Sequence, residues 1–125
     1  MKPIPRTEER RAAFRRGHRA ELFCLWHLRL KGYRILARRY RGVAGEVDLI
    51  ARRGRVLAAV EVKIRPDFAT AVEAIGPRQR QRVTRALAQF LAGRPDLAKL
   101  APRFDVMLVT PWRWPVHIVD AWREE

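Results

Sequence analysis

The sequence predicts a single α/β domain in which helices flank a mixed central β-sheet. Its 125 residues suit one domain, and a hydrophobic content of 48% suffices for a core without disulfide bonds. Two stretches have helical periodicity and five have the character of strands, in the order α-βββ-α-β-β. We therefore expect one domain over residues 1–125, with residues 1–6 as a flexible basic tail.

The first element is a long helix that is expected to reach about Leu30. Lys31-Gly32 then ends it, because glycine tolerates the left-handed conformation that closes many helices. Apolar side chains recur along one broad side of this stretch, as in a helix that packs on a core. They are Phe14, Leu22, Leu25, Trp26 and Leu28.

The first strand is expected at residues 33–41, which alternate loosely between apolar and basic residues. Successive side chains of a strand point to opposite faces of the sheet. Tyr33, Ile35 and Ala37 should therefore share one face, opposite Arg34, Leu36 and Arg38.

A hairpin follows, with the second strand at residues 46–51 and the third at residues 56–64. The Arg-Arg-Gly-Arg stretch between them suits a hairpin turn. A slip of one residue in their pairing would move every side chain to the other face, which the apolar pattern should forbid. Two pairings remain open, with the turn centred either on Gly54-Arg55 or on Arg53-Gly54.

Charged residues on this hairpin form the candidate site. Glu46 and Asp48 share one face of the second strand, and period-two alternation likewise groups Glu61 with Lys63 on the third. In the first pairing Asp48 lies opposite Glu61. In the second, Glu46 lies opposite Glu61, and Asp48 lies opposite Ala59. Both pairings gather carboxylates beside one lysine.

This cluster favours a divalent cation, because like charges on neighbouring strands destabilise a sheet. Carboxylate oxygens suit Mg²⁺ or Mn²⁺ better than zinc. A metal held by Asp48 and Glu61 can polarise a phosphodiester and help to generate hydroxide from water. Lys63 can position that water or stabilise charge on the phosphate, for which a compact ammonium group is well suited. The alternative is a solvated hairpin face with ordinary ion pairs.

A second helix is expected from Pro77 to Gly93, since proline favours the first helical position and glycine the end. Residues 104–110 and 116–119 are expected to form the fourth and fifth strands. The apolar stripe of the helix has core-facing spacing and consists of Val83, Ala86, Leu87, Phe90 and Leu91.

The strongest compositional feature is the charge. Lysine and arginine number 27 against 13 acidic residues, which gives a formal net charge of +14. Such a field attracts polyanions; we expect nucleic acid, most commonly DNA, with an anionic membrane surface as the competing partner. For any single arginine the alternative is a solvated surface position. The arginines expected to contact phosphates are Arg15, Arg16, Arg19, Arg41, Arg78 and Arg82.

We expect a cytoplasmic location and no membrane partner. The single cysteine, Cys24, excludes an internal disulfide, fits a reducing compartment and is expected in the core. Residues 1–17 are polar and basic and have none of the apolar stretch of a signal peptide. No apolar run approaches the roughly 20 residues that span a bilayer.

The motif Gly-Glu-Val-Asp-Leu-Ile at residues 45–50, followed by Val-Glu-Val-Lys-Ile-Arg at residues 60–65, resembles the YraN family of bacterial proteins. Residues 17–21, 32–38 and 103–106 agree with the resemblance, which covers nearly the whole chain. It implies a restriction-endonuclease-like fold with the PD-(D/E)xK motif.

By this resemblance Asp48, Glu61 and Lys63 take the places of the motif's aspartate, its second acid and its lysine. Glu21 takes the place of a helix glutamate that Holliday-junction resolvases of this fold add to their metal site. The alternative for Glu21 is a rim position with its carboxylate in water. The implied activity is that of a Mg²⁺- or Mn²⁺-dependent endonuclease acting on structured or branched DNA.

Glu46 and Arg65 are expected beside these metal ligands, and Glu46 is alternatively a surface acid. The chain departs from the family pattern in two places. Val47 stands where the motif often has proline, and Arg-Gln-Arg at residues 78–80 stands where the family usually has a lysine.

Two other classes of function remain open. One is a non-catalytic DNA- or RNA-binding protein that keeps the nuclease fold. The other is an interaction protein whose Trp112 and Trp114, which flank Arg113 in a proline-bounded loop, contact a partner or a second copy in a homodimer. The same tryptophans can cap the core or stack on bases.

Overall fold

The computed structural model describes residues 6–67, 69 and 75–123, and of residues 6–10 and 12–15 it describes the backbone only. Most of the tail expected at residues 1–6 lies outside these ranges, and Arg6 already belongs to the first helix. The elements in chain order are α1 (Arg6–Leu30), β1 (Arg34–Arg41), β2 (Glu46–Arg53), β3 (Val56–Ile64), α3 (Pro77–Ala92), the 3₁₀ helix η1 (Pro95–Leu97), β4 (Ala101–Val109) and β5 (Val116–Trp122).

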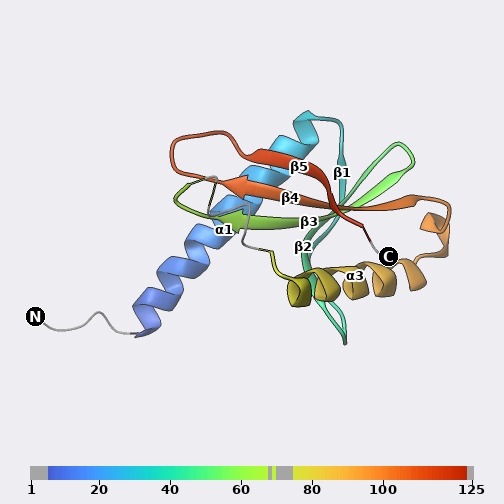
Figure 1. The fold of residues 1–125 in the computed structure, drawn as a ribbon, viewed down its shortest axis with the longest axis horizontal. Coiled ribbons are helices and arrows are strands. Elements are labelled where there is room, and N and C mark those ends of the chain that lie inside the picture. The colour runs from blue at the N-terminus through green and yellow to red at the C-terminus, as the bar shows by residue number, and fades with distance from the viewer. Residues whose placement is uncertain (1–5, 68, 70–74, 124–125) are drawn as a thin grey trace, which may run out of the picture.

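A mixed five-stranded sheet forms the centre of the fold, with its strands in the order β1-β2-β3-β4-β5. Neighbouring strands are antiparallel except for β3 and β4, which run parallel. A parallel pair needs a crossover connection, and α3 lies in it. The two long helices cover opposite faces of the sheet, and the N-terminal turns of α1 extend beyond it (Figure 1). This architecture confirms the predicted fold class, the restriction-endonuclease-like arrangement.

The two helices bury separate apolar clusters against the sheet. Leu28 of α1 packs in one cluster with Leu49, and Leu87 of α3 packs in the other with Ile50. Leu49 and Ile50 are successive residues of β2 and face opposite helices, as strand alternation requires. Burial of a side chain of this size stabilises the fold by about 1.5–3 kcal/mol. The site-bearing strands are therefore held firmly from both faces.

Helix α1 ends at Leu30, and Gly32 closes it as the sequence predicts. Gly32 has a φ of 91°, and its N–H donates to the carbonyl of Arg29. The N–H of Tyr33 donates to the carbonyl of Leu28. This pair of hydrogen bonds satisfies carbonyls that the end of a helix would otherwise leave unpaired, and it turns the chain directly into β1.

The β2–β3 hairpin adopts the first of the two predicted pairings. Leu49 pairs with Val60 at the end of the ladder that is farther from the turn. The next residue on each strand is Asp48 on β2 and Glu61 on β3, as the first pairing predicts. The turn contains Gly54 with a φ of 59°, a conformation that costs glycine little. The hairpin thus brings the two candidate carboxylates together at the end of its ladder.

The alternation predicted for the first strand is wrong beyond Ile35. The pairing of β1 with β2 shifts between Ile35 and Ala37, so Leu36 is an additional residue in a β-bulge. Ile35 packs against the α1-side cluster, whereas Ala37 packs against the α3-side cluster. A bulge reverses the face of the side chains that follow it. The apolar pattern does not reveal it, because it depends on the partner strand.

The last two strands are longer than the sequence predicts. β4 begins at Ala101 rather than at residue 104, and β5 continues to Trp122 rather than ending at residue 119. β4 pairs with β3 along its full length, and Phe104 pairs with Trp122 beyond an irregularity in the β4–β5 ladder. Pairing in the sheet here overrides a weak local preference.

Candidate active site

The candidate site lies where strands β2 and β3 separate. Their regular pairing runs as far as Leu49 and Val60. Beyond that point side-chain carboxylates connect the two backbones. The N–H of Asp48 donates to Oε1 of Glu61 over 3.2 Å, and the N–H of Val62 donates to Oδ2 of Asp48 over 2.8 Å. The two acids therefore bridge the opening that a backbone ladder would otherwise close.

Lys63 reaches Glu61 through a glutamine of α3. Nζ of Lys63 donates to Oε1 of Gln79 over 2.8 Å, and Nε2 of Gln79 donates to Oε2 of Glu61 over 2.9 Å. Gln79 belongs to the first turn of α3, so this chain of hydrogen bonds ties the helix to the site. Gln79 is not among the predicted site residues, although it lies in the stretch where the family usually has a lysine.

Both carboxylates have raised pKa values, and burial is the main cause for each. Glu61 is only 4% exposed, and burial, followed by the charge of Asp48, raises the pKa of Glu61 to about 8. Burial also raises the pKa of Asp48, with a smaller contribution from Glu21, while the Val62 N–H and the Lys63 charge oppose the increase. Two ionised carboxylates here are therefore costly without an additional cation.

An open pocket of about 310 Å³ lies on one side of Asp48. Glu21 and Glu46 reach the same pocket, whereas Glu61 and Lys63 are not part of its lining. The structure thus brings Asp48 together with Glu61 on β3 and, through the pocket, with Glu21 on α1. The residues that line the pocket are Gly17, Glu21, Arg39, Arg41, Glu46, Val47, Asp48, Val62 and Ile64.

Glu21 enters the pocket as one half of an ion pair. Its Oε2 lies 2.6 Å from Nε of Arg39, and Nη2 of Arg39 lies 3.0 Å from Nδ1 of His18. Arg39 has a φ of 49°, which is uncommon for a residue with a side chain and typical of a locally strained strand. The sequence contains no local signal for this pairing, because it requires β1 and α1 to be packed together.

Glu46 is half exposed and pairs with two arginines that were expected to contact phosphates. Arg82 of α3 lies 3.1 Å from one oxygen of Glu46, and Arg41 lies 3.7 Å from the other. Arg65 donates to the carbonyl of its neighbour Ile64. Arg65 lines a second groove, separate from the pocket beside Asp48.

The remaining arginines are placed along two helices. Arg16 and Arg19 are exposed on α1, and Arg78 is exposed at the start of α3. The side chain of Arg15 lies outside the described residues.

Cys24 is fully buried in the core, as expected, and burial together with the nearby acids raises the pKa of its thiol to about 12. That thiol is not poised as a nucleophile.

The donor set fits a hard divalent cation. Within the described part of the chain, no three acidic, histidine or cysteine side chains converge as a preformed metal cage. Mg²⁺ commonly uses one or two carboxylates and keeps several waters, which matches Asp48 in the lining of an open pocket with Glu61 adjoining it on β3. Their raised pKa values also indicate that a cation would relieve repulsion. The residues therefore suit Mg²⁺ or Mn²⁺.

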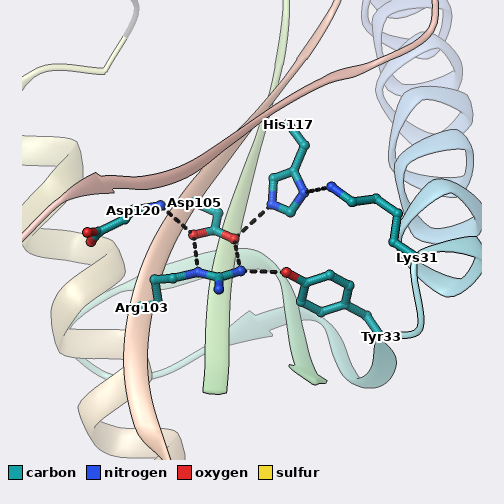
Figure 2. A network of polar contacts seen from close by, with 6 residues as sticks. All are labelled: Lys31, Tyr33, Arg103, Asp105, His117 and Asp120. Atoms are coloured by element: carbon teal, nitrogen blue, oxygen red, sulfur yellow. Dashed lines mark hydrogen bonds and ion pairs between the residues drawn. The ribbon is translucent and has the colours of Figure 1, made fainter. Parts of the chain in front are cut away.

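A second polar cluster surrounds Asp105 of β4 on the α1 side of the sheet (Figure 2). Arg103 donates to both carboxylate oxygens over 2.8 and 2.9 Å and also contacts the hydroxyl of Tyr33. Nε2 of His117 lies 2.8 Å from Asp105, and Nδ1 of His117 lies 2.6 Å from Nζ of Lys31. Lysine has only donors, so Nδ1 accepts and Nε2 carries the proton given to Asp105.

This Asp105 cluster connects β4 and β5 to the end of α1. Burial alone would raise the pKa of Asp105, but hydrogen bonds from His117, Arg103 and the Asp120 N–H outweigh it, and the pKa is lowered. In the sequence, Arg103 and Asp105 appeared only as part of a motif in the late strand. Their pairing with Tyr33 and Lys31 depends on tertiary packing.

Comparison with known proteins identifies close relatives. A model of the uncharacterised protein family UPF0102 matches residues 20–109. A UPF0102 protein of Parvibaculum lavamentivorans is 54% identical over 112 residues, covering 90% of this chain and 84% of that protein. One of Paramagnetospirillum magneticum is 54% identical over 128 residues, covering 98% of each.

No helix within the described part of the chain combines the length and apolar character needed to cross a membrane.

Proposed function

The chain belongs to the uncharacterised protein family UPF0102, which is also called the YraN family, and we propose that this member is a Mg²⁺- or Mn²⁺-dependent endonuclease acting on structured or branched DNA. The observation that carries the proposal is the pairing of the partly buried Asp48 with the buried Glu61 at the opening between β2 and β3. Two adjoining acids with raised pKa values, one of which lines an open pocket, are typical of a catalytic site. The net charge of +14 supports a polyanionic substrate.

Each residue of the site has a defined task in this proposal. Asp48 and Glu61 would hold the cation, which supplies polarisation of the phosphodiester and a water of lowered pKa. Lys63 provides positive charge next to the reacting phosphate and is kept in place by Gln79. Glu21 lines the same pocket as Asp48, and Arg39 compensates its charge.

The direct test is cleavage of four-way junction, flap and blunt duplex DNA by the purified full chain with Mg²⁺, with Mn²⁺ or with EDTA. We expect cleavage that requires the metal and disappears in Asp48→Ala and Glu61→Ala. Asp96→Asn serves as the matched control, because Asp96 is an exposed acid in a surface ion pair. Absence of cleavage on every substrate, or cleavage that persists in both alanine variants, would contradict the proposal.

A non-catalytic nucleic-acid-binding protein is the alternative, and one observation favours it. Asp48 and Glu61 already accept hydrogen bonds from backbone N–H groups across the strand opening, so the pair has a structural task without any metal. This alternative predicts DNA or RNA binding that survives Lys63→Ala and EDTA. Titration of Mn²⁺ into the wild type and into Asp48→Ala separates the two, because only a metal site loses binding in the variant.

A further inference from the structure

A second hollow of about 620 Å³ lies between α1 and the segments that leave β3 and β4. We call it the α1 groove. Its floor is largely apolar and includes Phe23, Ile64, Val109 and Pro111. All its charged lining residues are arginines, namely Arg16, Arg19 and Arg65.

The α1 groove adjoins the candidate active site. Ile64 lines both the groove and the pocket beside Asp48. It directly follows Lys63 on β3, and Arg65 follows it into the groove. A strand whose phosphate reaches the Asp48–Glu61 pair therefore has its neighbouring nucleotide within reach of the groove.

Exposed aromatic rings mark one end of the groove. The ring of Phe23 stacks on that of Trp114 with centroids 5.4 Å apart and planes 22° apart, yet Trp114 remains 66% exposed. Trp112, next to Pro111, is fully exposed and has a φ of 63°. Left-handed backbone at such a residue costs about 1–2 kcal/mol. Exposed aromatic rings such as these provide surfaces on which bases can stack.

We propose that the α1 groove binds an unpaired nucleotide adjoining the scissile phosphate. Its base would stack on the exposed face of the Phe23–Trp114 pair, and its phosphate would contact Arg16 and Arg19. An arginine rim without acids complements a polyanion, and a flat aromatic surface complements a base. A base within a duplex is covered on both faces, so only an unpaired one fits. The inference rests on the proposed nuclease function for its position relative to the cleaved bond.

The test is binding of fluorescent oligonucleotides by the full chain in EDTA. The probes are a blunt duplex and the same duplex with an oligo(dT) tail at its 3′ or its 5′ end. We expect one of the tails to tighten binding by about tenfold, and Phe23→Ala or Trp114→Ala to remove that gain. Trp114→Phe, which keeps an aromatic ring, should retain most of it.

Two matched controls exclude a general loss of binding. Trp26→Ala removes an exposed tryptophan of α1 that lies outside the groove lining, and it should keep the tail-dependent gain. Arg19→Ala should weaken tailed-duplex binding and lower its salt dependence by about one ion. Arg55→Ala, in the turn at the other end of the β2–β3 hairpin, should leave the gain from the tail intact.

A tail that adds no affinity to the wild type overturns the inference, as does a gain that survives both Phe23→Ala and Trp114→Ala. Sedimentation that shows a DNA-free dimer dissociated by Phe23→Ala also overturns it, because the groove would then be a contact between two copies. Thermal unfolding and circular dichroism of each variant exclude loss of fold. Trp26 and Trp114 are both exposed, so the variants at these two positions should fold.

The outcomes separate this inference from the proposed function. If no DNA is cleaved but the tail-dependent gain persists, the nuclease proposal fails and the groove remains a nucleotide site. If metal-dependent cleavage occurs equally on blunt and tailed duplexes and no gain is found, the groove assignment alone fails.

Discussion

Glu61 is a carboxylate in an environment that opposes its ionisation. It is buried and lies next to Asp48, and Gln79 connects it to the positive charge of Lys63. In a protein without a metal requirement, such a residue would be a net cost to stability. Its presence at this position is best explained by a task in binding or catalysis.

In the metal-free protein, Glu61→Gln should increase stability, and the increase should grow with pH. The pKa of Glu61 is about 8 in the fold against an ordinary 4.5, so the folded state keeps a proton that the unfolded state loses. Wild-type stability therefore falls as pH rises between these values and levels off above about 8. The difference at the alkaline end should be on the order of a few kcal/mol.

Urea unfolding of both proteins in EDTA across this pH range measures the effect. Asp96→Asn, at an exposed ion pair, should leave the pH slope of the wild type unchanged. Parallel stability curves for the wild type and Glu61→Gln would contradict the interpretation.

Asp105→Asn should lower the free energy of unfolding by about 3 kcal/mol, because it leaves the partly buried Arg103 without its anion. The pKa of Asp105 is lowered in the fold, so its contribution is present above the ordinary value of 3.8 and is lost as pH falls below it. Unfolding at neutral and at acid pH should therefore show a larger effect near neutrality. Equal effects at both would indicate a packing defect instead.

At the scale of elements, the contact of the β1–β2 turn with α3 positions Gln79. A Cβ atom at Gly45 would collide with the backbone carbonyl of Arg82 in α3. Only glycine therefore allows the helix to pack this closely against the start of β2. The same helix carries Gln79 to Glu61, so the turn and the site are mechanically connected.

Gly45→Ala should destabilise the protein by roughly 2–3 kcal/mol, because α3 must move away from the turn. It should also weaken metal binding, since Gln79 shifts with the helix. Gly76→Ala is the control, as an added Cβ there meets no atom within 4 Å. Thermal unfolding and Mn²⁺ titration measure both effects, and a Gly45→Ala protein as stable as the control would refute the role of this contact.

At the scale of the whole molecule, the excess of arginine dominates the expected interaction with DNA. A net charge of +14 predicts duplex binding that weakens steeply with salt, by a logarithmic slope of about 0.9 for each phosphate contacted. The charge is unevenly compensated. Arg94 is paired with Asp96, whereas Arg78 is exposed at the start of the helix that reaches the site.

Arg78→Ala should lower the slope of the salt dependence by about one ion, and it should weaken binding similarly for all DNA sequences. Arg94→Ala should change the slope little, because its charge is already compensated. Fluorescence anisotropy over a range of salt concentrations measures both. Identical slopes for the two variants would remove Arg78 from the DNA-binding surface.

The sequence alone determined the order of the long helices and the strands, the closure of α1 by Gly32 and the face shared by the site acids. These features depend on local periodicity and on glycine, which act within a few residues. Strand parity limited the hairpin to two pairings, and the one observed places Asp48 beside Glu61. Membership of the family was also evident from contiguous motifs.

Only the tertiary structure decided the bulge in β1, the Gln79 link and the pairing of Glu21 with Arg39. Each depends on contacts between different elements. Side-chain patterns record which face is buried but not which partner meets it. The Asp105 cluster and the α1 groove arise in the same way, because residues of three or more elements must be assembled before either exists.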